Sequence, residues 1–207
     1  MDDIRILSTS GLDALIAELR RRGFRVVGPT VRGDAIVTAD ISAAADLPIG
    51  VGDQQDPARY RLTQRDNGAY FGFADPAQST KPVFFPAEEV VWRGRREDSH
   101  FTVERDTPDA QPVALLGVRS CDLRAVQIHD KVLADRQFHD AHYVARRDGT
   151  FTVAVACGEP AATCFCASMG TGPRPAAAYP ETHEPSYDLL LTEVITESTH
   201  HFVMEVG

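Results

Sequence analysis

Two continuous apolar runs in the second half of the chain constrain the fold most strongly. Residues 113–118 (VALLGV) and 151–156 (FTVAVA) have the pattern of buried strands. Between them lies a helical pattern at 122–133, with Leu123 and Val126 among its apolar positions. Strand, helix and strand in this order predict neighbouring parallel strands in an α/β layer.

The remaining patterns predict shorter elements. Leu12, Ile16 and Leu19 recur at helical spacing, and Gly23 follows as a natural helix stop. Helices are therefore expected at 11–22 and near 86–89, strands at 24–28, 35–40, 69–74, 83–85, 189–192 and 202–206, and a stretch that is mainly loop at 47–65.

Together these elements predict an α/β fold, with α+β as the alternative. We expect a mixed sheet flanked by helices, with a cysteine-rich loop at one edge of the sheet. The polar stretch 94–110 is expected to be exposed and to separate an N-terminal α/β region at 1–98 from a cysteine-bearing α/β region at 99–207. One compact domain is the alternative, since this length suits one substantial domain or two small ones.

Composition excludes several classes of function. The formal net charge of −9 disfavours nucleic-acid binding, which needs clustered Lys and Arg. No apolar run approaches the roughly 20 residues of a membrane-spanning helix. The start, Met1-Asp2-Asp3, lacks the basic and apolar segments of a signal peptide. The predicted location is the cytoplasm, where thiols stay reduced and metal binding is favoured over disulfides.

All four cysteines lie in the second half of the chain, at the ends of predicted elements or in a loop. Cys121 opens the helix after the first apolar strand, and Cys157 follows the second strand directly. Cys164 and Cys166 lie in the next loop. Because the C-terminal ends of parallel strands share the edge where α/β folds place their sites, we expect the four thiols to converge there.

Four convergent thiols suit a metal centre, because thiolates hold both Fe–S clusters and structural zinc. The Cys-x-Cys pair cannot easily close on itself as a disulfide. The usual zinc signature of two close pairs and the ferredoxin run of cysteines are both absent, so spacing does not choose the metal. Two other interpretations stay open: buried apolar side chains, or a thiol redox enzyme that uses Cys164 or Cys166.

Charged residues near the cysteines in sequence add two expectations. Nearby arginines could offset the negative charge of a four-thiolate cluster, or they could form a solvated face and pair with Asp122 and Asp148. The arginines are Arg119, Arg124, Arg146 and Arg147. Asp122 is also the first candidate to replace a cysteine as a ligand.

Two motifs carry a family resemblance. The runs GVRSCDLRA at 117–125 and CGEP…TCFC…SMGTGP at 157–173 resemble the β subunits of cytoplasmic sulfhydrogenases, and are similar to the iron–sulfur electron-transfer subunit of anaerobic sulfite reductase. The segments RYRL at 59–62 and YDLLLTE at 187–193 continue the likeness. The usual member also has a C-terminal ferredoxin-like region with two cysteine-rich motifs, so this chain corresponds to an N-terminal portion or a shortened relative.

The resemblance implies an electron-relay subunit without bond-making chemistry of its own. Its partners would be a flavin- and NAD(P)-binding subunit and a catalytic subunit, in a hydrogenase-like or sulfite-reductase-like complex. The resulting hypothesis is one [4Fe–4S] cluster, with structural zinc as the alternative cofactor. Its ligands are Cys121, Cys157, Cys164 and Cys166.

Overall fold

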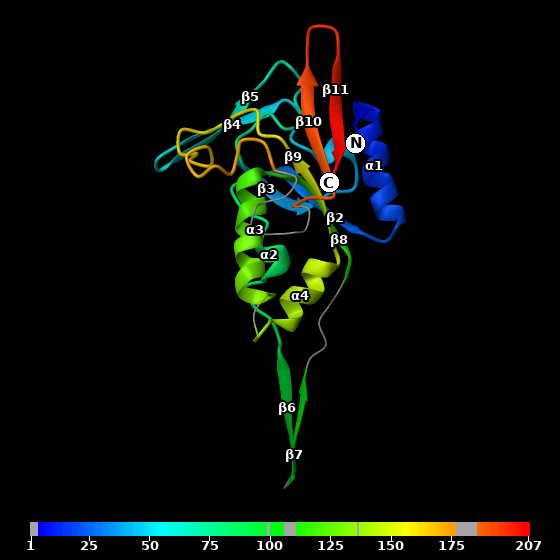
Figure 1. Cartoon of the computed structure of the whole chain (residues 1–207), viewed down its shortest axis with the longest axis vertical. Helices are drawn as coiled ribbons and strands as arrows, with labels where there is room; N and C mark the ends of the chain where they lie inside the picture. Colours follow the sequence, from blue (N-terminus) through cyan, green and yellow to red (C-terminus); the bar gives the residue numbers. More distant parts are fainter. Residues whose placement is uncertain (1–3, 99, 106–110, 136, 177–185) are drawn as a thin grey trace.

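The computed structural model describes residues 4–98, 100–105, 111–135, 137–176 and 186–207 (Figure 1). A seven-stranded sheet with the strand order β1-β11-β10-β9-β8-β2-β3 forms its centre. The strands are β1 (Arg5–Ser8), β2 (Arg25–Arg32), β3 (Ala35–Asp40), β8 (Val113–Val118), β9 (Thr150–Val155), β10 (Leu189–Ile195) and β11 (His200–Val206). The helices are α1 (Thr9–Arg21), α2 (Lys81–Phe84), α3 (Ser120–Leu133) and α4 (Ala141–Asp148), with a 3₁₀ turn η1 (Ala44–Asp46).

The sheet is mixed, as predicted. Strands β2, β8, β9 and β10 run parallel to their neighbours in this group, whereas β3, β11 and β1 pair antiparallel at the two sides. Figure 1 shows α1 on one side of the sheet and α3 on the other. The predicted α/β fold with a mixed, helix-flanked sheet is therefore confirmed, including the two central strands and the helix between them.

Both faces of the central strands are buried, which explains their continuous apolar sequences. On β8, Leu116 packs in the cluster that contains α1, whereas Leu115 packs in the cluster that contains α3 and α4. On β9, Val155 and Ala154 divide in the same way. Since successive strand residues point to opposite faces, a strand covered on both sides must be apolar at every position.

Strands from both sides of residue 98 contribute to this sheet. The division of the chain into regions 1–98 and 99–207 nevertheless stays a prediction, as does its alternative of one compact domain.

The loop predicted at 47–65 was wrong, because most of it forms an antiparallel hairpin. Its strands are β4 (Val51–Asp56) and β5 (Arg59–Gln64). Polar side chains such as Gln54 and Gln55 hid the period-2 pattern that identifies a strand.

The strand predicted at 69–74 was also wrong: these residues are irregular. Their backbone bonds to side chains rather than to a neighbouring strand. The carboxylate of Glu193 accepts from the N–H groups of Tyr70 and Phe71 at 2.7 and 3.0 Å. The Asp53 carboxylate accepts from the Ala74 N–H group at 2.8 Å. Because these partners come from β10 and β4, the local sequence could not indicate them.

Three other predicted elements differ in the structure. The strand predicted at 83–85 was wrong, because α2 occupies most of it and buries Phe84 against Tyr143 with their ring centroids 6.2 Å apart. The predicted helix start near 86–89 was wrong as well, since the described chain there is irregular. Within 94–110, the described residues are exposed as predicted, but most form a second hairpin, β6 (Trp92–Glu97) and β7 (His100–Arg105). Residues 99 and 106–110 lie outside the described part.

Candidate functional site

The candidate site lies where β8 and β9 end. The two strands are parallel neighbours, with Val118 paired to Ala154, so Cys121 and Cys157 follow at the same edge of the sheet, as predicted. The pairing shifts at Gly117, whose φ of +84° favours glycine. A side chain at Gly117 would also meet the Phe71 ring at 3.1 Å. Glycine here lets β8 turn directly into α3.

The cysteine loop, residues 156–176, folds back onto this edge. The Cys157 N–H group donates to the Pro173 carbonyl at 3.2 Å. At the other end, the Ser120 hydroxyl donates to the Thr171 carbonyl. These two bonds tie the loop to both strand ends, so the loop cysteines are held near Cys121 and Cys157.

Gly172 leaves room for the Cys166 thiol beside the start of α3. A Cβ atom at Gly172 would lie 2.8 Å from Cys166 Sγ and 3.5 Å from the Cβ atom of Ser120. Cys166 is therefore close to the residue that precedes Cys121. Cys164 lies in a tight turn, where the Ala161 N–H group donates to its sulfur at 3.2 Å.

The thiols also influence one another through their charges. Burial raises the pKa of Cys121 to about 12, with Asp75, Asp122 and the Cys166 thiol adding to the effect, although part of the residue is open to solvent. Burial likewise raises the pKa of Cys157, where Arg119 opposes the increase and the two loop cysteines add to it. The four sulfurs therefore belong to one electrostatic environment, drawn from three separate segments.

Arg119 lies beneath this edge and is 1% exposed. Its guanidinium donates to the carbonyls of Phe71, Phe73 and Ala156 at 2.9, 2.8 and 3.2 Å. It also lies 4.8 Å from the centre of the Phe73 ring. Of the alternatives for this arginine, a solvated face is wrong, because the side chain is buried and binds backbone carbonyls between the two strand ends.

The other nearby arginines lie elsewhere. Arg146 pairs with Glu89, and Arg147 pairs with Asp130 at 3.3 Å, both on the side of α4. A residue that the sequence analysis missed is Arg65, which binds Glu159 of the cysteine loop at 2.9 Å. No sequence signal links these two residues, because they are far apart in the chain.

Two acidic side chains complete the surroundings. Burial raises the pKa of Asp75 to about 7, with Asp122 adding to the effect and Arg119 opposing it. Burial also raises the pKa of Asp122, whose carboxylate accepts from the Thr80 N–H group at 3.1 Å. Asp122 thus lies near the thiols, but the Thr80 bond already occupies one of its oxygens.

The geometry of the site differs from that of a preformed mononuclear centre. Within the described residues, no three His, Cys, Asp or Glu side chains are grouped so that they could hold one metal ion. The cysteines share an edge without converging on a single point.

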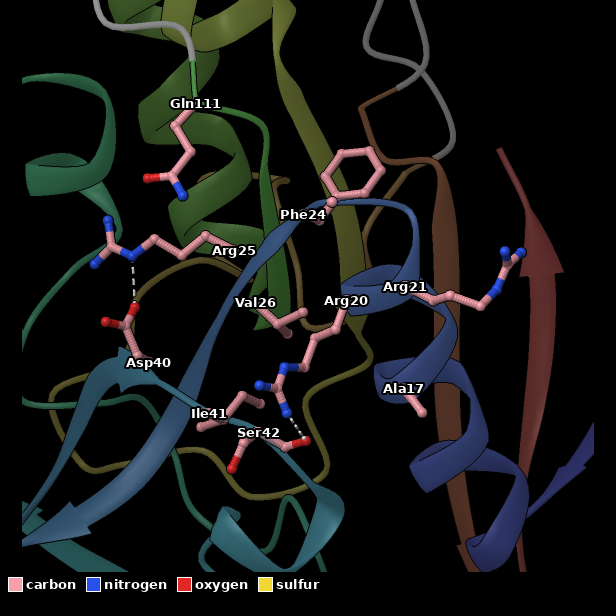
Figure 2. Close-up of a pocket in the computed structure, with 11 residues that line it drawn as sticks. Ala17, Arg20, Arg21, Phe24, Arg25, Val26, Asp40, Ile41, Ser42 and Gln111 are labelled. Carbon is pink, nitrogen blue, oxygen red and sulfur yellow. Dashed lines mark hydrogen bonds and ion pairs between the residues drawn. The ribbon is translucent and has the colours of Figure 1, made fainter.

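A separate pocket of about 780 Å³ lies at the opposite end of the parallel strands, near the start of β2 (Figure 2). Two of its arginines are already engaged. Arg25 pairs with Asp40 at 2.6 Å, and Arg20 donates to the Ser42 carbonyl at 3.0 Å. Figure 2 shows Arg21 pointing away from these groups. The pocket therefore lacks the convergent reactive side chains found at the cysteine edge.

Comparison with known proteins gives one partial relative. The chain is 42% identical over 57 residues to the protein named sulfhydrogenase 2 subunit beta of Pyrococcus furiosus. The match covers 28% of this chain and 16% of that protein. No family model matches, and no solved structure matches. Among the described residues, no helix is long and apolar enough to cross a membrane. The expected resemblance is thus supported over a short stretch, which relates the chain to an oxidoreductase subunit.

Proposed function

We propose that this chain holds one [4Fe–4S] cluster and relays electrons within a multi-subunit oxidoreductase of the cytoplasm. The ligands would be Cys121, Cys157, Cys164 and Cys166. The observation that carries the proposal is the arrangement of these cysteines, which approach one sheet edge from two parallel strands and one loop above a buried arginine.

The residues at this edge suit such a cluster. Its irons lie between the sulfurs, so four ligands need not converge as closely as they do around one ion. The cluster would supply one-electron redox chemistry, and the N–H group that already donates to Cys164 Sγ is of the kind that tunes its potential. Arg119 would offset the negative charge of the thiolates. Its buried Nε has no hydrogen-bond partner among the described residues, which an anionic group nearby could satisfy.

The relay role comes from the similarity to a sulfhydrogenase β subunit. We infer that the partners are a flavin- and NAD(P)-binding subunit and a catalytic subunit of a hydrogenase-like or sulfite-reductase-like complex. The chain itself would hold and pass electrons, and the partners would perform the bond-making chemistry.

Anaerobic purification of single Cys→Ser variants tests the proposal. Iron and acid-labile sulfide are measured beside the parent, which should contain about four of each per chain and show broad visible absorption. Each variant should lose most of its iron, because a hard hydroxyl replaces a soft thiolate poorly. The matched control is Ser168→Ala, an exposed change in the same loop, which should keep the parental iron content.

Three results would contradict the proposal. Colourless protein that contains zinc would favour a structural zinc domain. Metal-free protein with a reactive Cys164 or Cys166 would favour a thiol redox enzyme. Full iron content in Cys121→Ser alone would remove Cys121 from the site and make Asp122 the next ligand to test.

A further inference from the structure

The β6–β7 hairpin has two chemically different faces. Strand alternation and the pairing register place Trp92, Phe101 and Val103 on one face, which we call the aromatic face. Its charged members are Arg96 and Arg105. The opposite face is polar throughout. It comprises Arg93, Arg95, Glu97, His100, Thr102 and Glu104.

The aromatic face is exposed. Trp92, Phe101 and Val103 are 56%, 62% and 57% exposed, and Figure 1 shows the hairpin projecting from the rest of the molecule beyond α4. A Cβ atom at Gly94 would lie 2.6 Å from the Phe101 ring and 3.3 Å from the Trp92 ring. The two rings therefore meet over Gly94 and form a continuous apolar surface.

Such a hairpin needs a partner to be stable. An isolated two-stranded ribbon is marginal in water, and a third surface is normally required. Exposed aromatic and arginine side chains together have the composition of interface hot spots. Among the paired residues of the two strands, this face carries arginines and no carboxylates. A complementary surface would therefore supply carboxylates around an apolar centre.

A second copy of the chain fits less well. If two aromatic faces met, arginines would face arginines, with no acidic group among the paired residues of either face to offset them. Like charges in contact oppose association. The charge pattern therefore favours a different polypeptide.

We propose that the aromatic face of the β6–β7 hairpin docks another protein subunit, through a surface that combines apolar side chains with carboxylates. The inference rests on the proposed assembly into a multi-subunit complex, and it specifies where the chain joins that complex. It does not depend on which cofactor the cysteines hold.

Cross-linking in the native complex tests the chemistry of the partner. The tagged chain is produced in its own cells as an Arg96→Lys, Arg105→Lys variant, which keeps both charges and adds amines. A zero-length carbodiimide joins an amine only to a carboxylate in contact. We expect cross-linked peptides between position 96 or 105 and an Asp or Glu of a different polypeptide. The control variant, Arg93→Lys with Arg95→Lys on the polar face, should give none.

A second measurement tests the apolar contact. Trp92→Ser with Phe101→Ser should lower recovery of the same cross-linked polypeptide by about tenfold or more. His100→Ser with Thr102→Ser, on the polar face, should leave it within about twofold. Cross-links to a second copy of this chain, cross-links from the polar face alone, or equal recovery from both double variants would overturn the proposal.

Iron content in the same preparations separates the two proposals. Iron-free chain that still docks through the aromatic face would contradict the cluster and leave the docking site standing. Iron-loaded chain whose partner is indifferent to Trp92 and Phe101 would contradict the docking site alone.

Discussion

Replacing Arg119 with methionine should destabilise the protein strongly. The guanidinium is buried and satisfies three backbone carbonyls, two in the irregular segment 69–74 and one beside Cys157. Methionine has a similar reach but donates no hydrogen bond. The change would leave the carbonyls of Phe71, Phe73 and Ala156 without this donor.

The magnitude follows from these contacts. Each buried carbonyl left unsatisfied costs about 1–3 kcal/mol. Removing a buried charge also ends its desolvation penalty, which offsets part of that loss, so we expect a net loss of about 3–5 kcal/mol, as for other broken buried charge networks. Because whole domains are stable by only about 5–15 kcal/mol, the effect should be large.

Urea unfolding of the metal-free protein, followed by circular dichroism, measures the loss. The control is Arg61→Met on β5, an exposed arginine whose replacement should stay within about 0.5 kcal/mol. If Arg119→Met does not fold, Arg119→Lys provides the measurement, since it keeps the charge but not the guanidinium fork. A loss below about 1 kcal/mol for Arg119→Met would refute the reasoning.

Three further predictions concern the cysteines. Gly172→Ala should lower iron content, because its Cβ would lie 2.8 Å from Cys166 Sγ, whereas Gly158→Ala, with nothing within 4 Å, should not; iron analysis compares them. In metal-free protein, alkylation of Cys121 measured by mass spectrometry should keep rising through about pH 10, since only the thiolate reacts and its pKa is about 12; a plateau near pH 9 would contradict this. Hydrogen exchange at 158–173 should be faster without the metal, and equal protection would refute coupled folding.

The central strands were predictable because burial on both faces leaves a signal at every position. Residues 113–118 read as one apolar run, and β8 occupies those same residues. The parallel pairing of β8 with β9 then followed from the helix between them. Since Cys121 and Cys157 come immediately after these strands, their shared edge could be predicted as well.

The irregular segment 69–74 shows where local patterns fail. Its aromatic residues have strand propensity, yet its backbone groups are bound by Glu193, Asp53 and Arg119. Propensity describes how a residue fits a pleated surface, and it carries no information about side chains that arrive from distant elements. The sequence therefore predicted the wrong structure at the segment that covers the buried arginine.

Arg119 itself could not be distinguished by sequence from the other arginines near the cysteines. Its role depends on β8 ending beside β9, because only that pairing brings the Ala156 carbonyl within 3.2 Å of its guanidinium. The same side chain binds the segment 69–74 and opposes the increase in the pKa of Cys157. One arginine therefore connects the strand ends, the irregular segment and a thiol, so a change that loosens any of these contacts should also disturb the electrostatics of the cysteine edge.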